Sequence, residues 1–268
     1  MTNVRAKKNL GQHFLKDQNI AKQIVESLQD KTLKKVLEVG PGMGVLTQYL
    51  LQDKTIETFA VEIDRESVEY LNLHYPEMKE RIFSKDFLRM NLHDYFEEPF
   101  ALIGNFPYNI SSQIFFKVLE YKDQIHEVVG MLQKEVAERL AAPPGSKVYG
   151  ILSVFLQAYY NIEYLFTVNE DVFSPPPKVK SGVIRVTRNE VKHLGCDEKL
   201  FKSVVKMAFN QRRKTMRNSL KPMINTNELK ANPIFDKRPE QLGVKDFVKL
   251  VQLIGDPTNV IDHSQIKE

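Results

Sequence analysis

Apolar and polar positions divide the first two thirds of the chain into short alternating segments. From about residue 17 to residue 185, apolar runs that resemble strands alternate with amphipathic stretches. The strand candidates are 34–40, 55–64, 81–84, 100–105, 127–133, 159–168 and 182–188. Helical patterns such as Val45–Leu51 and Arg65–His74 lie between them. This order predicts an α/β fold with a mostly parallel sheet and helices on both faces, closed by 159–168 and 182–188 as an antiparallel pair.

Two segments depart from this alternation. "FSPPPKVKS" (173–181) is expected to be an extended loop, because three prolines exclude both a helix and a central strand. "KKNLGQHFL" (7–15) is too polar for a strand, and no local structural role explains Gln12 and His13.

After about residue 190 the pattern becomes helical. Helices are expected over 197–211, 214–224 and 238–255, with Asp197 and Thr226 as caps. We therefore expect two domains: an α/β domain over 1–190 and a small all-helical domain over 191–268.

Composition narrows the class of protein. The 268 residues are 42% hydrophobic and 27% charged, as in an ordinary soluble globular protein. No apolar run approaches the roughly 20 residues of a membrane span, and the polar start lacks a signal-peptide core. A single cysteine, Cys196, excludes an internal disulfide and a cysteine-rich metal site. These features indicate a cytoplasmic protein.

The net charge of +4 is small, but the basic residues are clustered. Between Leu200 and Pro222 there are seven lysines and arginines and no acidic residue, and the first 16 residues add four more basic side chains. Such zones on a near-neutral background indicate a polyanionic partner. A solvated helix face is the alternative explanation of this run.

"VLEVGPGMGVLT" (36–47) combines a strand, a glycine loop at Gly40, Gly42 and Gly44, and a helix. Glycines allow a ligand to approach the backbone, and a helix N-terminus offers free N–H groups. Glu62 ends the next strand, where a carboxylate can accept hydrogen bonds from a ribose diol. Asp86, after the third strand, could accept from an adenine amino group. Together these residues predict a nucleoside cofactor.

"ALIGNFPYNIS" (101–111) places Asn105-Phe106-Pro107-Tyr108 at the end of a buried strand. Ligands of parallel α/β sheets bind beyond the carboxyl ends of the strands. An adenine amino nitrogen is a poor nucleophile, because its lone pair is delocalised into the ring. Two carbonyl oxygens, from the Asn105 side chain and the Phe106 main chain, could accept its N–H bonds and localise that pair. Tyr108 could stack on the flipped base, and Pro107 would keep the turn rigid.

The ordered set "NLGQHFL", "EVGPGMG", "VEID", "KDFL", "IGNFPYNIS", "FSPPPKVKS" and "AFNQRRKTMRNSL" resembles the KsgA-type ribosomal RNA adenine dimethyltransferases over nearly the whole chain. The resemblance implies a Rossmann-like class I methyltransferase sheet, S-adenosylmethionine as cofactor, and residues 1–16 as a segment that caps it. The implied cofactor residues are Gln12, His13, Leu15, Gly40, Gly42, Gly44, Glu62, Ile63, Asp86, Phe87 and Asn105. Phe173 would pack against the target adenine opposite Tyr108.

The family's substrate is a pair of adjacent adenosines in a hairpin loop near the 3′ end of small-subunit (16S) ribosomal RNA. Each becomes N6,N6-dimethyladenosine during subunit assembly. We expect this chain to act on that RNA as a monomer, with no metal and no membrane. The helical domain is expected to recognise the RNA, with the α/β domain contributing Lys7, Lys8 and Lys178. On a continuous helix through 204–220, an apolar stripe would leave a basic face for RNA, and the expected contacts in this region are Arg212, Arg213, Lys214, Arg217 and Lys221.

Three other assignments share part of these motifs. A macrolide-resistance methyltransferase would act on large-subunit RNA, but "FNQRRKTMRNSL" resembles the assembly-factor type. A DNA adenine methyltransferase would usually carry a separate recognition domain, for which 268 residues leave little room. A non-catalytic assembly factor would not need an intact glycine loop, Glu62 and Asn105–Tyr108.

Overall fold

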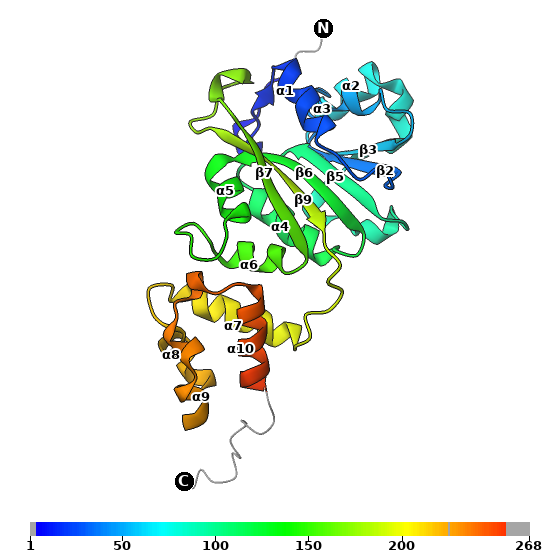
Figure 1. Cartoon of the computed structure of the whole chain (residues 1–268). Helices are drawn as coiled ribbons and strands as arrows, with labels where there is room; N and C mark the ends of the chain where they lie inside the picture. Colours follow the sequence, from blue (N-terminus) through cyan, green and yellow to red (C-terminus); the bar gives the residue numbers. More distant parts are fainter. Residues whose placement is uncertain (1–3, 225, 256–268) are drawn as a thin grey trace, which may run out of the picture. The chain divides into compact units, whose positions relative to one another are not determined.

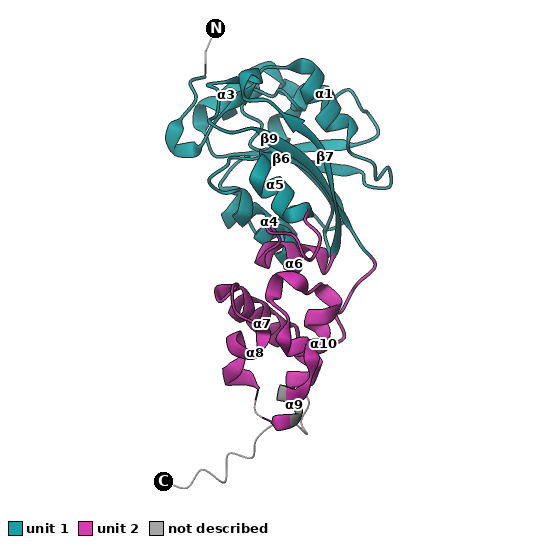
Figure 2. Cartoon of the chain, turned by 60° about the vertical axis from the view of Figure 1, so that its left-hand side comes forward, with its two compact units in different colours: residues 1–141, 160–189 teal, residues 142–159, 190–268 magenta. Residues whose placement is uncertain are grey.

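The computed structural model describes residues 4–224 and 226–255 (Figure 1). The chain forms two compact units (Figure 2): residues 1–141 with 160–189, and residues 142–159 with 190–268. The division near residue 190 lies where the sequence pattern changes. However, 142–159, which we expected in the α/β domain, groups with the helical unit. Residues 256–268 of the expected helical domain lie outside the described part.

The first unit contains a seven-stranded sheet with the order β4-β3-β2-β5-β6-β9-β7. Its strands are β2 (Lys35–Val39), β3 (Glu57–Glu62), β4 (Ile82–Ser84), β5 (Phe100–Asn105), β6 (Ile125–Gln133), β7 (Tyr160–Val168) and β9 (Ser181–Arg188). The pairings from β4 to β6 are parallel, whereas β9 pairs antiparallel with both β6 and β7. The expected mostly parallel sheet, with 159–168 and 182–188 as an antiparallel pair, is confirmed. β2 has β3 on one side and β5 on the other, so the carboxyl ends of β2 and β5 form a topological switch point.

Helices pack on both faces of this sheet (Figure 1). On one face, α1 (Gln18–Glu26) and α2 (Thr47–Leu50) share a core cluster with alternate residues of β2, β5 and β6, such as Val36, Ile103 and Val129. Their chain neighbours Leu37 and Leu102 are also buried and face the opposite side. There Phe115 of α4 (Ser111–Glu120) packs edge-on against Phe106.

The remaining elements of the first unit complete the sheet's surroundings. α5 (Lys134–Ala141) lies against β6, β7 and β9, and α3 (Arg65–His74) lies beside β3 and β4. Short 3-10 turns span Lys8–Leu10, Pro76–Arg81, Phe87–Arg89, Leu92–Asp94 and Glu170–Val172.

A small second sheet corrects two expectations. β1 (Phe14–Leu15) pairs antiparallel with β8 (Phe173–Ser174), so neither 7–15 nor 173–181 is entirely without strand. Only the apolar end of the first segment and the residues before the prolines of the second take part. Leu15 lies opposite Phe173, and both side chains enter the core cluster under α1. Burial of these two side chains explains why the pair forms despite its polar surroundings.

The second unit is helical. It contains α6 (Ile151–Gln157), α7 (Glu198–Asn210), α8 (Met216–Ser219), α9 (Asn227–Ala231) and α10 (Val244–Gly255), with 3-10 turns at Lys221–Met223, Pro233–Asp236 and Pro239–Gln241. The two expected caps are confirmed: the Asp197 side chain accepts from the first turn of α7, and Thr226 Oγ1 accepts from Leu229 N.

The expected continuous helix through 204–220 is wrong. α7 ends at Asn210, residues 211–214 form a turn, and α8 begins at Met216. The apolar stripe nevertheless packs as expected: Met216 and Leu220 are buried, and the Phe209 ring contacts those of Tyr149 and Phe247. Local spacing correctly identified the buried positions, and the break agrees with the separate helices expected over 197–211 and 214–224 rather than with the continuous helix.

Candidate active site

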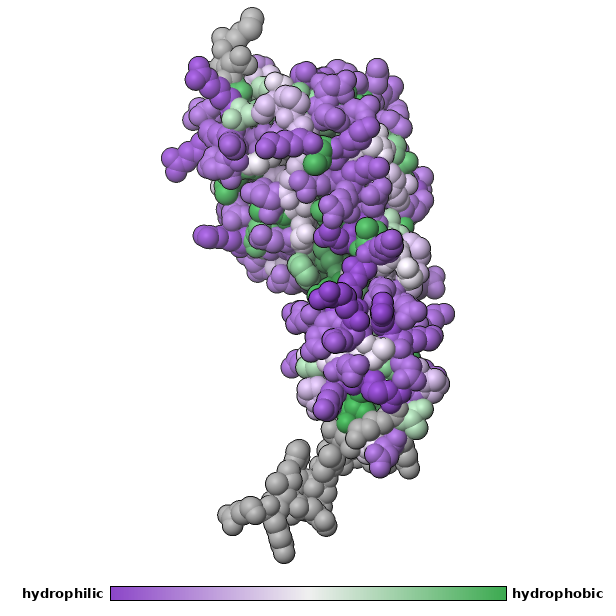
Figure 3. All heavy atoms as spheres, turned by 90° about the vertical axis from the view of Figure 1, so that its left-hand side faces the viewer, coloured by the Kyte–Doolittle hydropathy of each residue, from purple (hydrophilic) through white to green (hydrophobic). Residues whose placement is uncertain are grey.

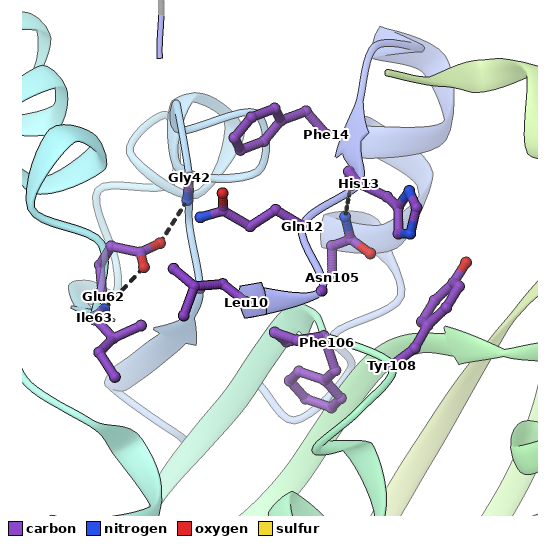
Figure 4. A pocket seen from close by; sticks show the side chains of 13 residues that line it. Leu10, Gln12, His13, Phe14, Gly42, Glu62, Ile63, Asn105, Phe106 and Tyr108 are labelled. Carbon is purple, nitrogen blue, oxygen red and sulfur yellow. Dashed lines mark hydrogen bonds between the residues drawn. The ribbon is translucent and has the colours of Figure 1, made fainter. Parts of the chain in front are cut away.

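A pocket opens at the carboxyl ends of β2 and β5 (Figure 4). Its first hollow is lined by the N-terminal segment 10–14, by the glycine loop, and by the Asn105–Tyr108 turn. A second hollow adjoins it and shares Gly40, Glu62 and Ile63 with the first. The structure thus brings together the three motifs that the sequence singled out: the N-terminal segment, the glycine loop after β2 and the turn after β5.

The glycine loop leaves its backbone open to a ligand. Gly40 and Gly42 have positive φ angles of 69° and 55°, a region that favours glycine. A Cβ on Gly40 would meet nothing within 4 Å, whereas one on Gly42 would come within 2.9 Å of the Phe14 ring. Gly40 lines both hollows, so the open space beside it is the pocket itself.

Glu62 is fixed at the floor of the pocket. Its side chain is 4% exposed, and Oε2 accepts from Gly42 N at 3.1 Å. Oε1 accepts from Ile63 N at 2.8 Å and Asp64 N at 2.9 Å. Burial raises the pKa of Glu62, although these three N–H groups favour its charged form. Ile63 beside it is 52% exposed and lines both hollows, so it offers apolar surface to a ring.

Asp86 and Phe87 line the second hollow. Asp86 Oδ1 accepts from Leu88 N at 2.9 Å and so caps the 3-10 turn Phe87–Arg89. Asp86 therefore caps this turn and lines the second hollow at the same time.

The N-terminal segment orients Asn105. Asn105 Nδ2 donates to the main-chain oxygen of His13 at 2.9 Å. This contact distinguishes the two ends of the amide and turns Oδ1 toward the side of the pocket where the His13 and Tyr108 rings lie (Figure 4). His13 is itself held, because its Nδ1 lies 2.8 Å from the main-chain oxygen of Pro175.

The two aromatic residues of the turn have different roles. Phe106 points into the core and is 1% exposed, and a Cβ on Gly104 or Gly130 would come within 2.8 Å or 2.4 Å of its ring. Tyr108 stays partly exposed at the pocket, with its ring centroid 5.5 Å from that of His13. Its hydroxyl lies 2.6 Å from Oγ of the buried Ser181. Phe106 therefore anchors the turn, and Tyr108 presents a ring face to the pocket.

A cluster of polar contacts closes the N-terminal segment over the pocket. Asp64 accepts from Lys7 Nζ, from Gln12 Nε2 at 3.4 Å and from Ser67 Oγ at 2.9 Å. Lys7 Nζ also lies 3.0 Å from Glu66 Oε1. Burial alone would raise the pKa of Asp64, but the hydrogen bonds from Lys7, Ser67 and Gln12 hold it below its usual value. Lys7, expected to contact RNA, is thus engaged within the chain.

Three residues that the sequence assigned to the site do not line the pocket. Leu15 and Phe173 are 4% and 1% exposed in the core, so Phe173 has no free ring face for a target adenine. Gly44, with a φ angle of 80°, instead makes room for Tyr75, whose ring would lie 2.4 Å from an added Cβ. The β1–β8 pairing and the Tyr75 contact are long-range features that no local motif reveals.

The expected RNA contacts also divide into two groups. Arg212 donates to the main-chain oxygens of Ser146 and Lys147, and Arg217 Nε donates to Asp236 Oδ1 at 3.0 Å. Asp236 is an acidic neighbour that the sequence run did not show. The side chains of Lys8, Lys178, Arg213, Lys214 and Lys221 are exposed.

Sequence reasoning missed several functional positions. Leu10, Gly11 and Phe14 line the first hollow, Asn109 lines the second, and Ser181 holds Tyr108. Among these residues, Gly11 is the one whose type gave a local signal, because a glycine often marks a positive φ angle. In the structure its φ angle is 66°, and it lies beside the Asn109 side chain.

Within residues 4–224 and 226–255, no group of three His, Cys, Asp or Glu side chains could hold a metal ion. No helix in that same part of the chain is both long and apolar enough to cross a bilayer. The face shown in Figure 3 is predominantly hydrophilic, with only scattered apolar patches.

Comparison with known proteins assigns the chain to a family. Residues 3–254 match the family of ribosomal RNA adenine dimethylases. Ribosomal RNA small subunit methyltransferase A of Parabacteroides distasonis is 62% identical over 251 residues, which covers 92% of this chain and 93% of that protein.

Solved structures agree on the fold alone. A dimethyladenosine transferase from Plasmodium falciparum superposes with a TM-score of 0.75 at 23% identity, covering 91% of this chain and 98% of that one. The 23S rRNA methyltransferase ErmE gives 0.63 at 23% identity, covering 89% and 99%. Because the family match extends over almost the whole chain, with the glycine loop, Glu62 and Asn105–Tyr108 in one pocket, the chain belongs to the ribosomal RNA adenine dimethylases.

Proposed function

We propose that this protein transfers methyl groups from S-adenosylmethionine to N6 of two adjacent adenosines in the 3′-terminal hairpin loop of small-subunit ribosomal RNA. The observation that carries the proposal is the Asn105 amide. Its nitrogen is held by the His13 carbonyl, so its oxygen faces the pocket beside Tyr108. An oriented carbonyl oxygen beside an aromatic ring suits an adenine amino group better than a hydroxyl or a carboxylate substrate.

The pocket fits the cofactor. Gly40 leaves open space for a ligand against the backbone, and Glu62 offers carboxylate oxygens for a ribose diol. Asp86 offers an acceptor for an adenine amino group, and Ile63 offers apolar surface. When bound, S-adenosylmethionine supplies an electrophilic methyl group on a sulfonium centre.

The chain's own residues prepare the target nitrogen. In the first transfer to each adenosine, Asn105 Oδ1 and the main-chain oxygen of Phe106 accept the two amino N–H bonds, which localises the nitrogen lone pair for attack; the nitrogen loses a proton once it is methylated. Tyr108 stacks on the flipped base, and its hydroxyl contact with Ser181 keeps the ring in place. The buried Phe106 ring anchors the turn that carries both acceptors. These interactions act mainly in the transition state, where they affect the rate most.

The second unit and the basic residues provide RNA recognition in this proposal. Arg213, Lys214 and Lys221 are exposed and lie around the turn and short helix after α7, in the second unit. Exposed cations of one sign bind phosphates and release counterions. Lys8 and Lys178, exposed on the first unit, would add phosphate contacts of their own. The protein would act in the cytoplasm, where ribosomal subunits are assembled.

The small subunit is favoured over other RNA substrates by the curated relative. The Parabacteroides protein carries a small-subunit name at 62% identity, whereas the large-subunit enzyme ErmE shares only 23%. Transfer of labelled methyl groups to unmethylated small subunits, large subunits and duplex DNA tests the choice. We expect label in the small-subunit RNA only, and label mainly in large subunits or DNA would overturn the proposal.

A further inference from the structure

Lys117 is a buried ammonium group that none of the roles above uses. It lies on α4 and is 6% exposed. Its Nζ donates to the main-chain oxygens of Met90 at 2.6 Å and Leu88 at 3.3 Å. The same ammonium lies 4.9 Å from the Tyr121 ring centroid and 5.7 Å from that of Phe87. Lysine is rarely buried without such partners, because an unpaired buried charge is costly.

The two carbonyl groups belong to the end of the 3-10 turn Phe87–Arg89. The last carbonyls of a helical turn lack partners within it, and a lysine side chain can satisfy them. At the other end of the turn, Asp86 Oδ1 accepts from Leu88 N. The turn is therefore fixed by a carboxylate at its start and by the Lys117 ammonium at its end.

The charge of Lys117 also acts on Asp86. Burial lowers the pKa of Lys117, while the negative charges of Glu120 and Asp86 oppose that effect. The Lys117 ammonium and the Asp86 carboxylate therefore attract each other.

This turn is a wall of the second hollow. Asp86, Phe87 and Leu88 all line it. The helix that carries Lys117 begins at Ser111, directly after the Asn105–Tyr108 turn. One rigid helix therefore connects the catalytic turn with the wall of the second hollow.

We propose that Lys117 is a positioning residue for cofactor selection. By capping the turn, its ammonium holds the Asp86 carboxylate where it accepts a hydrogen bond from the adenine amino group of the cofactor. The ligand class selected in this way is a 6-aminopurine nucleoside rather than a 6-oxopurine nucleoside. This inference rests on the proposed function, which assigns the adenine to the second hollow.

Calorimetric titration with S-adenosylhomocysteine and with S-inosylhomocysteine tests it. The second ligand carries an oxygen where adenine has its amino group. We expect the wild type to prefer S-adenosylhomocysteine, and Lys117→Met to reduce that preference by about tenfold, as expected for a misaligned charge-assisted hydrogen bond. Lys117→Arg should restore most of it. Lys22→Met is the control: it removes the same charge from an exposed position on α1, where Lys22 pairs with Glu26, and the preference should not change.

The two proposals fail in different ways. If the wild type does not distinguish the ligands, the adenine is not read by Asp86, and both the site assignment and the Lys117 inference fall. If the wild type distinguishes them and Asp86→Asn does not, the site assignment stands. In that case a folded Lys117→Met variant with the full wild-type preference would show that Lys117 has only a structural role.

A measurement on the wild type covers the case in which Lys117→Met does not fold. Lysine labelled with ¹⁵N at Nζ allows the buried ammonium to be followed by NMR. We expect the Lys117 signal to shift on saturation with S-adenosylhomocysteine and to shift less with S-inosylhomocysteine. Equal shifts with both ligands would overturn the inference.

Discussion

At the scale of single residues, the site uses side chains that the main chain already orients. Asn105 has its nitrogen bound to the His13 carbonyl, and Glu62 has both oxygens bound to N–H groups. The residue types could be predicted from the sequence, because an amide and a carboxylate at strand ends indicate their chemistry. Their orienting partners could not, because His13 lies 92 positions away from Asn105.

Glu38 is a second buried carboxyl group near the pocket. It lies on β2, is 1% exposed, and Oε2 accepts from Thr47 Oγ1 at 2.6 Å. Burial raises its pKa to about 8, and the charge of Glu62 adds to the effect. Because Glu38 precedes the glycine loop and Thr47 begins α2, this hydrogen bond joins the two sides of the loop.

We predict that Glu38→Gln stabilises the protein at pH 8 more than at pH 5. The unfolded chain loses this proton near pH 4.3, whereas the folded protein keeps it until about pH 8. The folded state binds more protons between these values, so its stability falls as pH rises, by at most about 1.4 kcal/mol per pH unit. Glutamine does not titrate and avoids this loss. Urea unfolding at pH 5 and pH 8 measures the free energy of unfolding of both proteins. An equal difference between variant and wild type at the two pH values would contradict the prediction.

At the scale of elements, local signals and long-range contacts contributed differently. The strands and the caps at Asp197 and Thr226 follow from apolar runs and capping chemistry. By contrast, β1 pairs with β8 across about 160 residues, and the break after α7 accompanies Arg212 contacts with Ser146 and Lys147. Sequence spacing contains no information about such partners.

The N-terminal segment should open when its anchor is removed. We predict that Asp64→Asn speeds amide hydrogen exchange of residues 7–13 and weakens cofactor binding a few-fold, because the Lys7 contact loses its charged acceptor. Asp53→Asn is a matched control, since Asp53 accepts from the Thr55 main chain and hydroxyl in a local turn. Hydrogen-exchange mass spectrometry measures this effect. If residues 7–13 exchanged as slowly in Asp64→Asn as in the wild type, the Lys7–Asp64 contact would not be what holds the segment.

The turn after α7 should bind RNA phosphates through its exposed basic side chains. We predict that Arg213→Glu with Lys214→Glu weakens small-subunit binding and lowers the slope of log affinity against log salt by roughly 0.7–0.9 per lost phosphate contact. Cofactor affinity should stay constant. Lys245→Glu with Lys249→Glu makes the same charge change on α10 and serves as the control. If the two double variants weakened small-subunit binding equally, the net charge of the protein rather than this turn would determine its affinity for the subunit.

At the scale of the whole molecule, the chain leaves the first unit and returns to it. Residues 142–159 belong to the helical unit although the sheet continues on either side of them. In that unit Tyr149 contacts Phe209, and Phe155 contacts Phe201. The sequence indicated a boundary near 190 because the pattern changes there, but nothing local shows that 142–159 pack with helices after it.

A fragment that ends at residue 189 should therefore be less soluble than the same fragment without residues 142–159. We predict that residues 1–189 alone expose the Tyr149 and Phe155 rings and aggregate. Replacing 142–159 in the same fragment with a flexible linker should restore solubility and cofactor binding, which light scattering and calorimetry would report. Equal solubility of the two fragments would contradict the unit boundaries.

The most direct test of the central claim is the product formed with the wild type and with Asn105→Ala. Small subunits lacking the modification would be incubated with S-adenosylmethionine, and nuclease digests analysed by mass spectrometry. We predict N6,N6-dimethyladenosine at two adjacent positions with the wild type. Asn105→Ala should reduce it by about a hundredfold or more while subunit binding persists, because the lost acceptor acts mainly in the transition state. Dimethyladenosine formed by Asn105→Ala at a near-wild-type rate, or a wild-type product on another base, would contradict the account.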